Sequence, residues 1–79
     1  MRVKYDKLVD AAYIYLDEEG ESAKSAKMCA CDPQEVGGMI NLDFDDEGRL
    51  IGIEVLDASS LLPTRVLGVR PGPSAQRIL

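Results

Sequence analysis

Histidine and tryptophan are absent from this chain, and its aromatic residues are one phenylalanine and three tyrosines. Without histidine, the sequence lacks the side chain that most often acts as a general base or binds a metal near neutral pH. Ser59 and Ser60 have no neighbouring base in the sequence and are better explained as turn residues. Because no nucleophile is paired with a base, we expect a protein that is not an enzyme and needs no cofactor.

Cysteine is scarce, since Cys29 and Cys31 are the only two. Residues two apart on an extended chain have poor geometry for a disulfide, so we expect reduced thiols and a cytoplasmic protein. A structural zinc site needs four ligands, so the two thiols of one chain are half of a set that a dimer could complete. The simpler interpretation is that both cysteines are small packing residues. The sequence also lacks a long apolar run and a charged-then-apolar leader, so we expect neither a membrane span nor secretion.

Basic residues are outnumbered by acidic ones, nine against fourteen, in a chain of 79 residues. This length predicts one small domain with a thin core. Residues 1–62 hold six bases and all fourteen acids, a net charge of −8, whereas residues 63–79 hold three arginines and no acid. We expect 1–62 to form the domain and 63–79 to be a mobile basic tail. An acidic body repels nucleic acid and favours a basic protein partner.

Apolar and polar residues alternate with a period of two in several stretches, which predicts β-strands. The stretches are MRVKY (1–5), AYIYL (12–16), MINLDF (39–44) and RLIGIEVL (49–56). A further stretch, SAKSAKMCAC (22–31), alternates too, although its alanines and lysines also favour helix. We favour an edge strand there, because lysine on an edge discourages further pairing.

The segments between these strands carry turn and cap signals. DKLVDAA (6–12), with Asp6 as its cap, and ASSLLP (58–63) each predict a short helical turn, and DPQEVGG (32–38) predicts a loop. We therefore expect an α+β, mostly β fold. It would hold a four- to five-stranded antiparallel sheet of hairpins with one or two short helical turns.

The segment LDFDDEGRLIGIE (42–54) has the acidic spacing of a calcium-binding EF-hand loop. Asp43, Asp45 and Glu47 stand at the first, third and fifth loop positions, with Gly48 at the sixth and Glu54 at the twelfth. An EF-hand needs a helix on each side, however, and both flanks here alternate with the period of strands. The sequence therefore predicts a β-hairpin with an acidic turn rather than a metal site.

The predicted turn consists of four residues, Asp45, Asp46, Glu47 and Gly48, and the glycine takes a left-handed conformation. This loop length would place Phe44 opposite Arg49, Leu42 opposite Ile51 and Ile40 opposite Ile53. All the apolar residues then share one face, as a half-buried hairpin requires. A three-residue loop would place Asp43 opposite Ile51 and spoil the pattern.

Two blocks of this chain resemble a small prokaryotic family, domain of unknown function 2283. They are YDKLVDAAYIYLDEEG and INLDFDDEGRLIGIEVLDAS, and the resemblance covers residues 1–62. The family pattern opens on tyrosine and aspartate and ends on an aspartate-rich turn followed by a GRLVGIEILDAS-like segment. The resemblance implies an antiparallel sheet with short helical turns. It supplies no established activity, so no catalytic residue can be transferred.

The polar face of the predicted hairpin gathers Asn41, Asp43, Asp45 and Glu54. In the predicted register, Gly52 lies opposite Asn41 and leaves a shallow gap. Such an acidic patch suits a basic partner surface or loosely held divalent ions. A plain solvated sheet face explains the same residues. These four residues are the candidate partner-binding face, and we predict no catalytic, cofactor or metal residue.

The opposite face is apolar, and no predicted helix is long enough to cover it. Its residues are Val3 or Tyr5, Ile14, Leu16, Ile40, Leu42, Phe44, Ile51, Ile53 and Val55. We expect two copies to pack these faces together as a homodimer. The favoured function is a non-enzymatic protein-interaction module, for instance an antitoxin-like partner of a basic protein. The alternative is a minor enzyme or metal-binding protein that uses the acidic hairpin face or Cys29 and Cys31.

Overall fold

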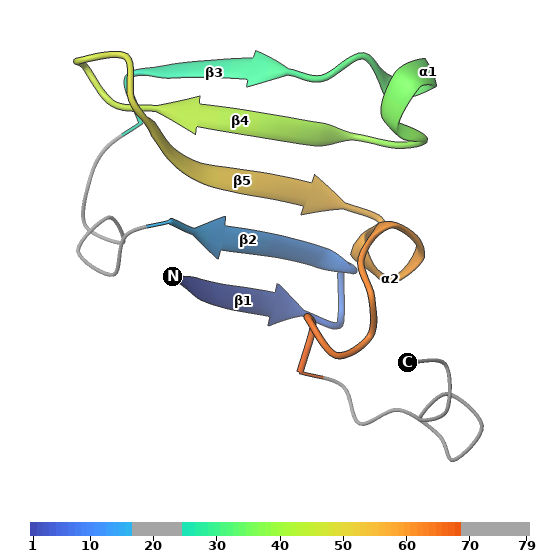
Figure 1. Cartoon of the computed structure of the whole chain (residues 1–79). Coiled ribbons are helices and arrows are strands. Elements are labelled where there is room, and N and C mark those ends of the chain that lie inside the picture. The colour runs from blue at the N-terminus through green and yellow to red at the C-terminus, as the bar shows by residue number, and fades with distance from the viewer. Residues whose placement is uncertain (17–24, 69–79) are drawn as a thin grey trace.

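The computed structural model describes residues 1–16 and 25–68, which form one antiparallel sheet with two short helices (Figure 1). The strands are β1 (Arg2–Asp6), β2 (Ala11–Tyr15), β3 (Lys27–Ala30), β4 (Ile40–Phe44) and β5 (Leu50–Leu56), and the helices are α1 (Pro33–Val36) and α2 (Ala58–Leu61). The five strands follow the order β1-β2-β5-β4-β3, so β3 is an edge strand. It covers Lys27–Ala30 of the edge strand predicted for residues 22–31, of which residues 22–24 lie outside the described residues. The predicted fold class is confirmed. Within these residues, no helix is both long and apolar enough to cross a membrane.

The segment between β1 and β2 is a tight turn, so the helical turn predicted for residues 6–12 is wrong. Asp6 pairs with Ala11, which leaves only the residues between them to reverse the chain. The carboxylate of Asp6 accepts a hydrogen bond from the backbone N–H of Leu8 (2.9 Å). Asp10 completes the turn in a left-handed conformation, with φ 53°. Aspartate side chains that bond to nearby backbone groups in this way favour turns over helix.

The loop predicted for residues 32–38 contains α1, which the sequence reasoning missed. Asp32 caps this helix by accepting a hydrogen bond from the N–H of Gln34 (3.0 Å), and Pro33 is its first residue. Gly37 ends it at φ 80° and donates its N–H to the carbonyl of Pro33 (2.9 Å). A helix of four residues is too short to show helical periodicity, so only these caps could have revealed it.

The predicted hairpin of β4 and β5 is confirmed, but its register is not the predicted one. The observed pairs are Ile40–Val55, Asn41–Glu54, Leu42–Ile53, Asp43–Gly52 and Phe44–Leu50. The N–H of Asp45 donates to the carbonyl of Arg49 (2.9 Å), so the loop has three residues instead of four. A bulge at the step from Asp43 to Phe44 leaves Ile51 as an extra residue in β5. The bulge compensates for the shorter loop and keeps the apolar residues on one face.

The strand pairings align the apolar residues in two rows across the sheet. The Ile14 row contains Val3, Ile14, Ile53 and Leu42, and the Val55 row contains Tyr5, Ala12, Val55 and Ile40. Among the described residues, the buried hydrophobic side chains are Ala12, Val55, Ala58 and Leu67. Helix α2 packs on this cluster through Ala58 and Leu61. The core therefore lies at the α2 end of the apolar face.

Residues 63–68 extend the packed structure past the domain boundary expected at residue 62. Leu67 is 7% exposed and lies in the same buried cluster as Ala58. Backbone hydrogen bonds from Val66 to Pro63 (2.9 Å) and from Leu67 to Thr64 (3.1 Å) shape this segment as turns. The start of the expected mobile tail is thus part of the fold, and residues 69–79 lie outside the described residues.

The conformation of Gly48 gives a first testable prediction. Gly48 ends the β4–β5 turn at φ 80°, and no atom lies within 4 Å of the Cβ that another residue would add. Gly48→Val should lower the free energy of unfolding by about 1 kcal/mol or more, because valine strongly disfavours the left-handed region. Gly48→Asn should lose less, because asparagine tolerates that region. Urea denaturation measures both variants, and a valine variant as stable as the wild type would refute the turn.

Candidate functional site

The polar face of the sheet is organised by Tyr13, a residue of β2. Its ring lies over Gly52, where an added Cβ would be 2.2 Å from the tyrosine hydroxyl oxygen. The hydroxyl donates a hydrogen bond to Oδ2 of Asp43 on β4 (2.6 Å), so the side chain spans β5. Burial and this hydrogen bond raise the pKa of Tyr13. The gap predicted at Gly52 is therefore wrong, because Gly52 pairs with Asp43 instead of Asn41 and the tyrosine fills the space.

Asn41 and Glu54 form the second pair of this face. They lie opposite each other on β4 and β5, and Nδ2 of Asn41 donates to Oε1 of Glu54 (2.9 Å). Asn41 is only 7% exposed, so its amide is packed into the sheet face and not solvated. A buried amide needs such a partner because an unsatisfied polar group costs about 1–3 kcal/mol. Glu54 is consequently held in place beside Tyr13, its partner on β2.

Asp45, the remaining candidate residue, does not join this face. Its Oδ1 accepts hydrogen bonds from the backbone N–H groups of Glu47 and Arg49 (both 2.9 Å), and its Oδ2 accepts one from Nε of Arg49 (3.2 Å). The backbone N–H of Arg49 makes the largest contribution to lowering the pKa of Asp45. Arg49 also forms an ion pair with Glu47. Asp45 therefore stabilises the turn, while Asn41, Asp43 and Glu54 meet on the sheet.

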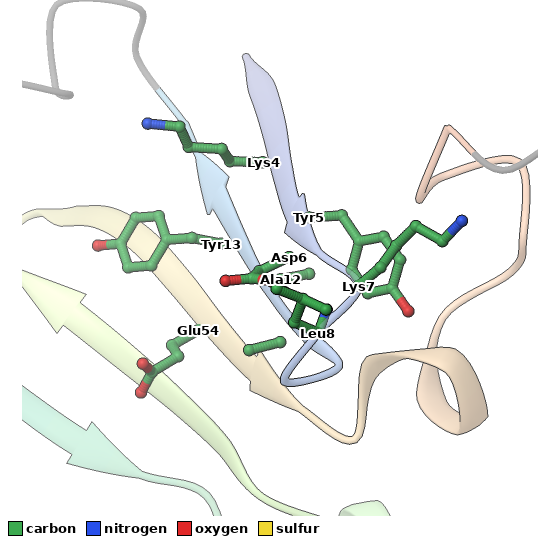
Figure 2. Close-up of a pocket in the computed structure, with 9 residues that line it drawn as sticks. Lys4, Tyr5, Asp6, Lys7, Leu8, Ala12, Tyr13 and Glu54 are labelled. Carbon is green, nitrogen blue, oxygen red and sulfur yellow. The ribbon is translucent and has the colours of Figure 1, made fainter.

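An open cavity of about 560 Å³ lies at the β1–β2 end of the polar face, and Glu54 is the one of these three residues that lines it (Figure 2). We call it the β1–β2 cavity. Tyr13 and Glu54 line one side, and Asp6 and Leu8 contribute from β1 and the turn that follows it. Ala11, the cross-strand partner of Asp6, also lines it. The sequence reasoning missed this cavity, because it depends on residues from three strands that only the register brings together.

A second polar cluster joins the β1–β2 turn to α2, and the sequence reasoning missed it as well. Oδ1 of Asp10 accepts hydrogen bonds from the hydroxyl of Tyr5 (2.7 Å) and the N–H of Ser59 (2.9 Å), and Oδ2 accepts one from the Ser59 hydroxyl (2.7 Å). The carbonyl of Asp10 accepts a further bond from the N–H of Ala58 (2.9 Å). Asp10 thus caps α2, whose own N-cap residue, Asp57, provides no side-chain cap. Asp10 and Ser59 are 49 residues apart, so no local signal predicts their contact.

The chemistry of this cluster favours a structural role. The hydrogen bond from the Ser59 side chain, followed by the one from Tyr5, lowers the pKa of Asp10. The pKa of Tyr5 is raised, chiefly by its bond to Asp10. A carboxylate with a lowered pKa is a weak general base, so it is poorly suited to activate the Ser59 hydroxyl. The cluster fixes α2 on the sheet.

Both thiols lie toward the β3 edge of the sheet. Cys29 pairs with Leu42, which places it on the apolar face, and the N–H of Cys31 donates to the carbonyl of Ile40 (2.8 Å). Both are free and half-buried. In the part of the chain that the structure describes, no three acidic, cysteine or histidine side chains gather in a metal-binding geometry.

The contact between Tyr13 and Gly52 generates the second prediction. Gly52→Ala should destabilise the protein by about 1–3 kcal/mol, because the added methyl group displaces the ring and breaks its bond to Asp43. The cost of Gly52→Ala should shrink in a Tyr13→Ala background, where no ring blocks the methyl group. Urea denaturation of the four proteins in this double-mutant cycle measures both effects. Equal costs in both backgrounds would mean that Tyr13 does not occupy this space.

The Asp10 cluster generates a prediction about pH. Because the folded-state pKa of Asp10 lies below its usual value of 3.8, ionised Asp10 contributes stability above that pH. This contribution is lost as the pH falls through the lowered folded-state pKa. Asp10→Asn should therefore be less stable at neutral pH and should lose less stability on acidification than the wild type. Asp46→Asn, in the exposed turn, is the control for removing one charge. Parallel acid unfolding curves for wild type and Asp10→Asn would contradict the assignment.

The model of the family described as "Protein of unknown function (DUF2283)" matches residues 2–59, which span β1 to the start of α2. Neither a curated protein nor a solved structure shows significant similarity to the chain. The matched region includes both polar clusters and all five strands. The family match confirms the resemblance found in the sequence, and the chain belongs to the DUF2283 family of proteins of unknown function.

Proposed function

We propose that this domain is a non-enzymatic protein-interaction module that works as a homodimer. The observation that supports this proposal is how little of the apolar sheet face is covered. Among the described residues, Val55 is the only large side chain that is fully buried. A soluble domain normally packs a second layer against the apolar face of its sheet.

Helix α2 and the following turn cover only one end of the face. They pack on Val55 and Ala12 in the Val55 row, and Val3 and Ile53 of the Ile14 row also pack against the buried cluster. Ile14 and Leu42, in the Ile14 row, remain partly exposed, as do Phe44 and Ile51 nearer the hairpin turn. Burying side chains of this size stabilises by about 1.5–3 kcal/mol each when burial is complete. Completing that burial would drive association.

A second copy of the chain is the partner that suits this surface. Sheets pack face to face through interdigitating apolar side chains, and a two-fold axis matches the same patch on both copies. The chain carries a net charge of −5. The carboxylates of Asp43 and Glu54 lie on the polar face, so they would point away from such an interface. Two acidic chains can therefore associate without bringing these carboxylates close to one another.

The polar face would remain exposed in this dimer and available to another protein. Asp43 and Glu54 are each held by a neighbouring side chain, which fixes the position of their charges. A basic protein is the partner we propose for this face, and an antitoxin-like pairing suits such an arrangement. The alternative use of the face or the thiols for catalysis or metal binding has less support, since these carboxylates bond to neighbouring side chains.

A matched pair of substitutions tests the homodimer. Ile14→Lys places a charge in the Ile14 row and should convert a dimer into a monomer, because the ammonium group would be buried without a partner. Met28→Lys introduces the same side chain opposite Asp43 on the polar face, where Met28 is 57% exposed, and should leave the dimer intact. Light scattering across a concentration series measures the mass, and circular dichroism reports folding.

The wild-type protein provides the result that is independent of both variants. It should sediment as a dimer across the micromolar range. A wild-type chain that stays a folded monomer at high concentration would overturn the proposal. So would a Met28→Lys variant that dissociates as fully as Ile14→Lys, since the interface would then lie elsewhere.

A further inference from the structure

Both short helices lie at one end of the strands, and the β4–β5 turn lies at the other end (Figure 1). Helix α2 rises above the apolar face at its own end, since Ala58 is fully buried in one cluster with Val55 and Ala12. An α-helix with its side chains is about 10 Å or more in diameter. The apolar face is therefore raised at one end, whereas the described residues place no helix at the opposite end.

The end of the apolar face near the β4–β5 turn holds a cross-strand pair, Leu16 and Ile51. The N–H of Leu16 donates to the carbonyl of Ile51 (3.2 Å). Each of them stands two residues from a member of the Ile14 row, so both side chains lie on the apolar face. Both are partly exposed. We call these two residues the Leu16–Ile51 pair.

The height of α2 restricts how two copies can pack their apolar faces together. Two packed sheets lie about 10 Å apart, which is room for one helix between them. When aligned sheets are related by a two-fold axis, that axis runs along the strands or across them. An axis along the strands would stack the two α2 helices on each other and hold the sheets apart. An axis across the strands instead places each α2 over the lower end of the other copy.

We propose that the second copy docks with its two-fold axis along the Ile14 row, so that α2 of each copy covers the Leu16–Ile51 pair of the other. Such an axis keeps β2 over β2 and β5 over β5, and these are the strands on which α2 packs. Leu61 and Leu62, at the end of α2, are only partly buried and supply the apolar contact. This inference rests on the proposed homodimer and names the segment that each copy contributes to the other.

The two cysteines report on this orientation, because an axis across the strands also places β3 over β3. Cys29 pairs with Leu42 and so ends the Ile14 row at the β3 edge. It therefore lies near the axis and faces Cys29 of the other copy. Cys31 stands two residues farther, about 6.6 Å along the strand, and the axis moves its counterpart by the same distance in the opposite direction. Only the Cys29 thiols approach each other.

Cross-linking of the full-length chain with a short bismaleimide tests the orientation. Each thiol adds across one maleimide double bond, so the reaction needs no oxidant. Cys31→Ser, which retains Cys29, should give a covalent dimer on a denaturing gel, whereas Cys29→Ser, which retains Cys31, should remain a single chain. An axis along the strands would bring β3 toward β1 of the other copy and leave both variants without cross-links. That result, or equal cross-linking of both variants, would overturn the proposed orientation.

A second pair of substitutions tests the contact with α2. Ile51→Ala should weaken dimerisation about tenfold, because its side chain loses the contact with α2 of the other copy. Met28→Ala, on the exposed polar face, should leave the dimer unchanged, and equal effects of the two variants would refute the contact. Circular dichroism confirms that both variants are folded. Light scattering separates the two proposals: a wild-type dimer that fails the cross-linking test overturns the orientation alone, and a wild-type monomer overturns the homodimer as well.

Discussion

The pairing of β5 between β2 and β4 is the constraint on which the rest of this structure depends. Because successive residues of a strand point to opposite faces, this register assigns Ile53 and Val55 to the apolar face and Gly52 and Glu54 to the polar face. The same register places Gly52 under the ring of Tyr13 and Glu54 beside Asn41. A slip of one residue would exchange both faces and remove the core and the polar network together.

The apolar face of the sheet is covered unevenly, and Asp10 holds in place the helix that covers part of it. Asp10 bonds to Ser59 and to the N–H of Ala58, so it holds the start of α2 over the Val55 row. This contact joins the first hairpin to the last helix. The opposite part of the apolar face, around Ile14 and Leu42, has no comparable cover among the described residues. The proposed dimer follows from this imbalance.

The sequence predicts the elements of the fold better than their mutual positions. Alternation identifies β4 and β5 within one residue at each end, and Gly48 marks the turn because its conformation is a local property. The three-residue loop could not be predicted, because the bulge before Phe44 restores the alternation that the shorter loop disturbs. Because the predicted register was wrong, the predicted partner of Gly52 was wrong as well: it pairs with Asp43 and not with Asn41.

For the polar clusters too, the sequence predicts which residues share a face but not which of them are in contact. Asn41, Asp43 and Glu54 could be assigned to one face from alternation, and the structure does bring them together. The part played by Tyr13 could not be inferred, since its hydroxyl reaches Asp43 from a strand 30 residues earlier. The bond between Asp10 and Ser59 depends on an even longer separation. Contacts of this kind are set by packing, for which local propensity carries no information.

We propose that the uncovered apolar face is an interface between two copies of the chain. The most direct measurement is isotope-filtered NMR on a mixture of labelled and unlabelled protein, which detects contacts between copies only. We predict intermolecular contacts between methyl groups of the Ile14 row, namely Val3, Ile14, Ile53 and Leu42. Intermolecular contacts confined to the β1 or β3 edge, or none at concentrations where the protein is folded, would contradict it.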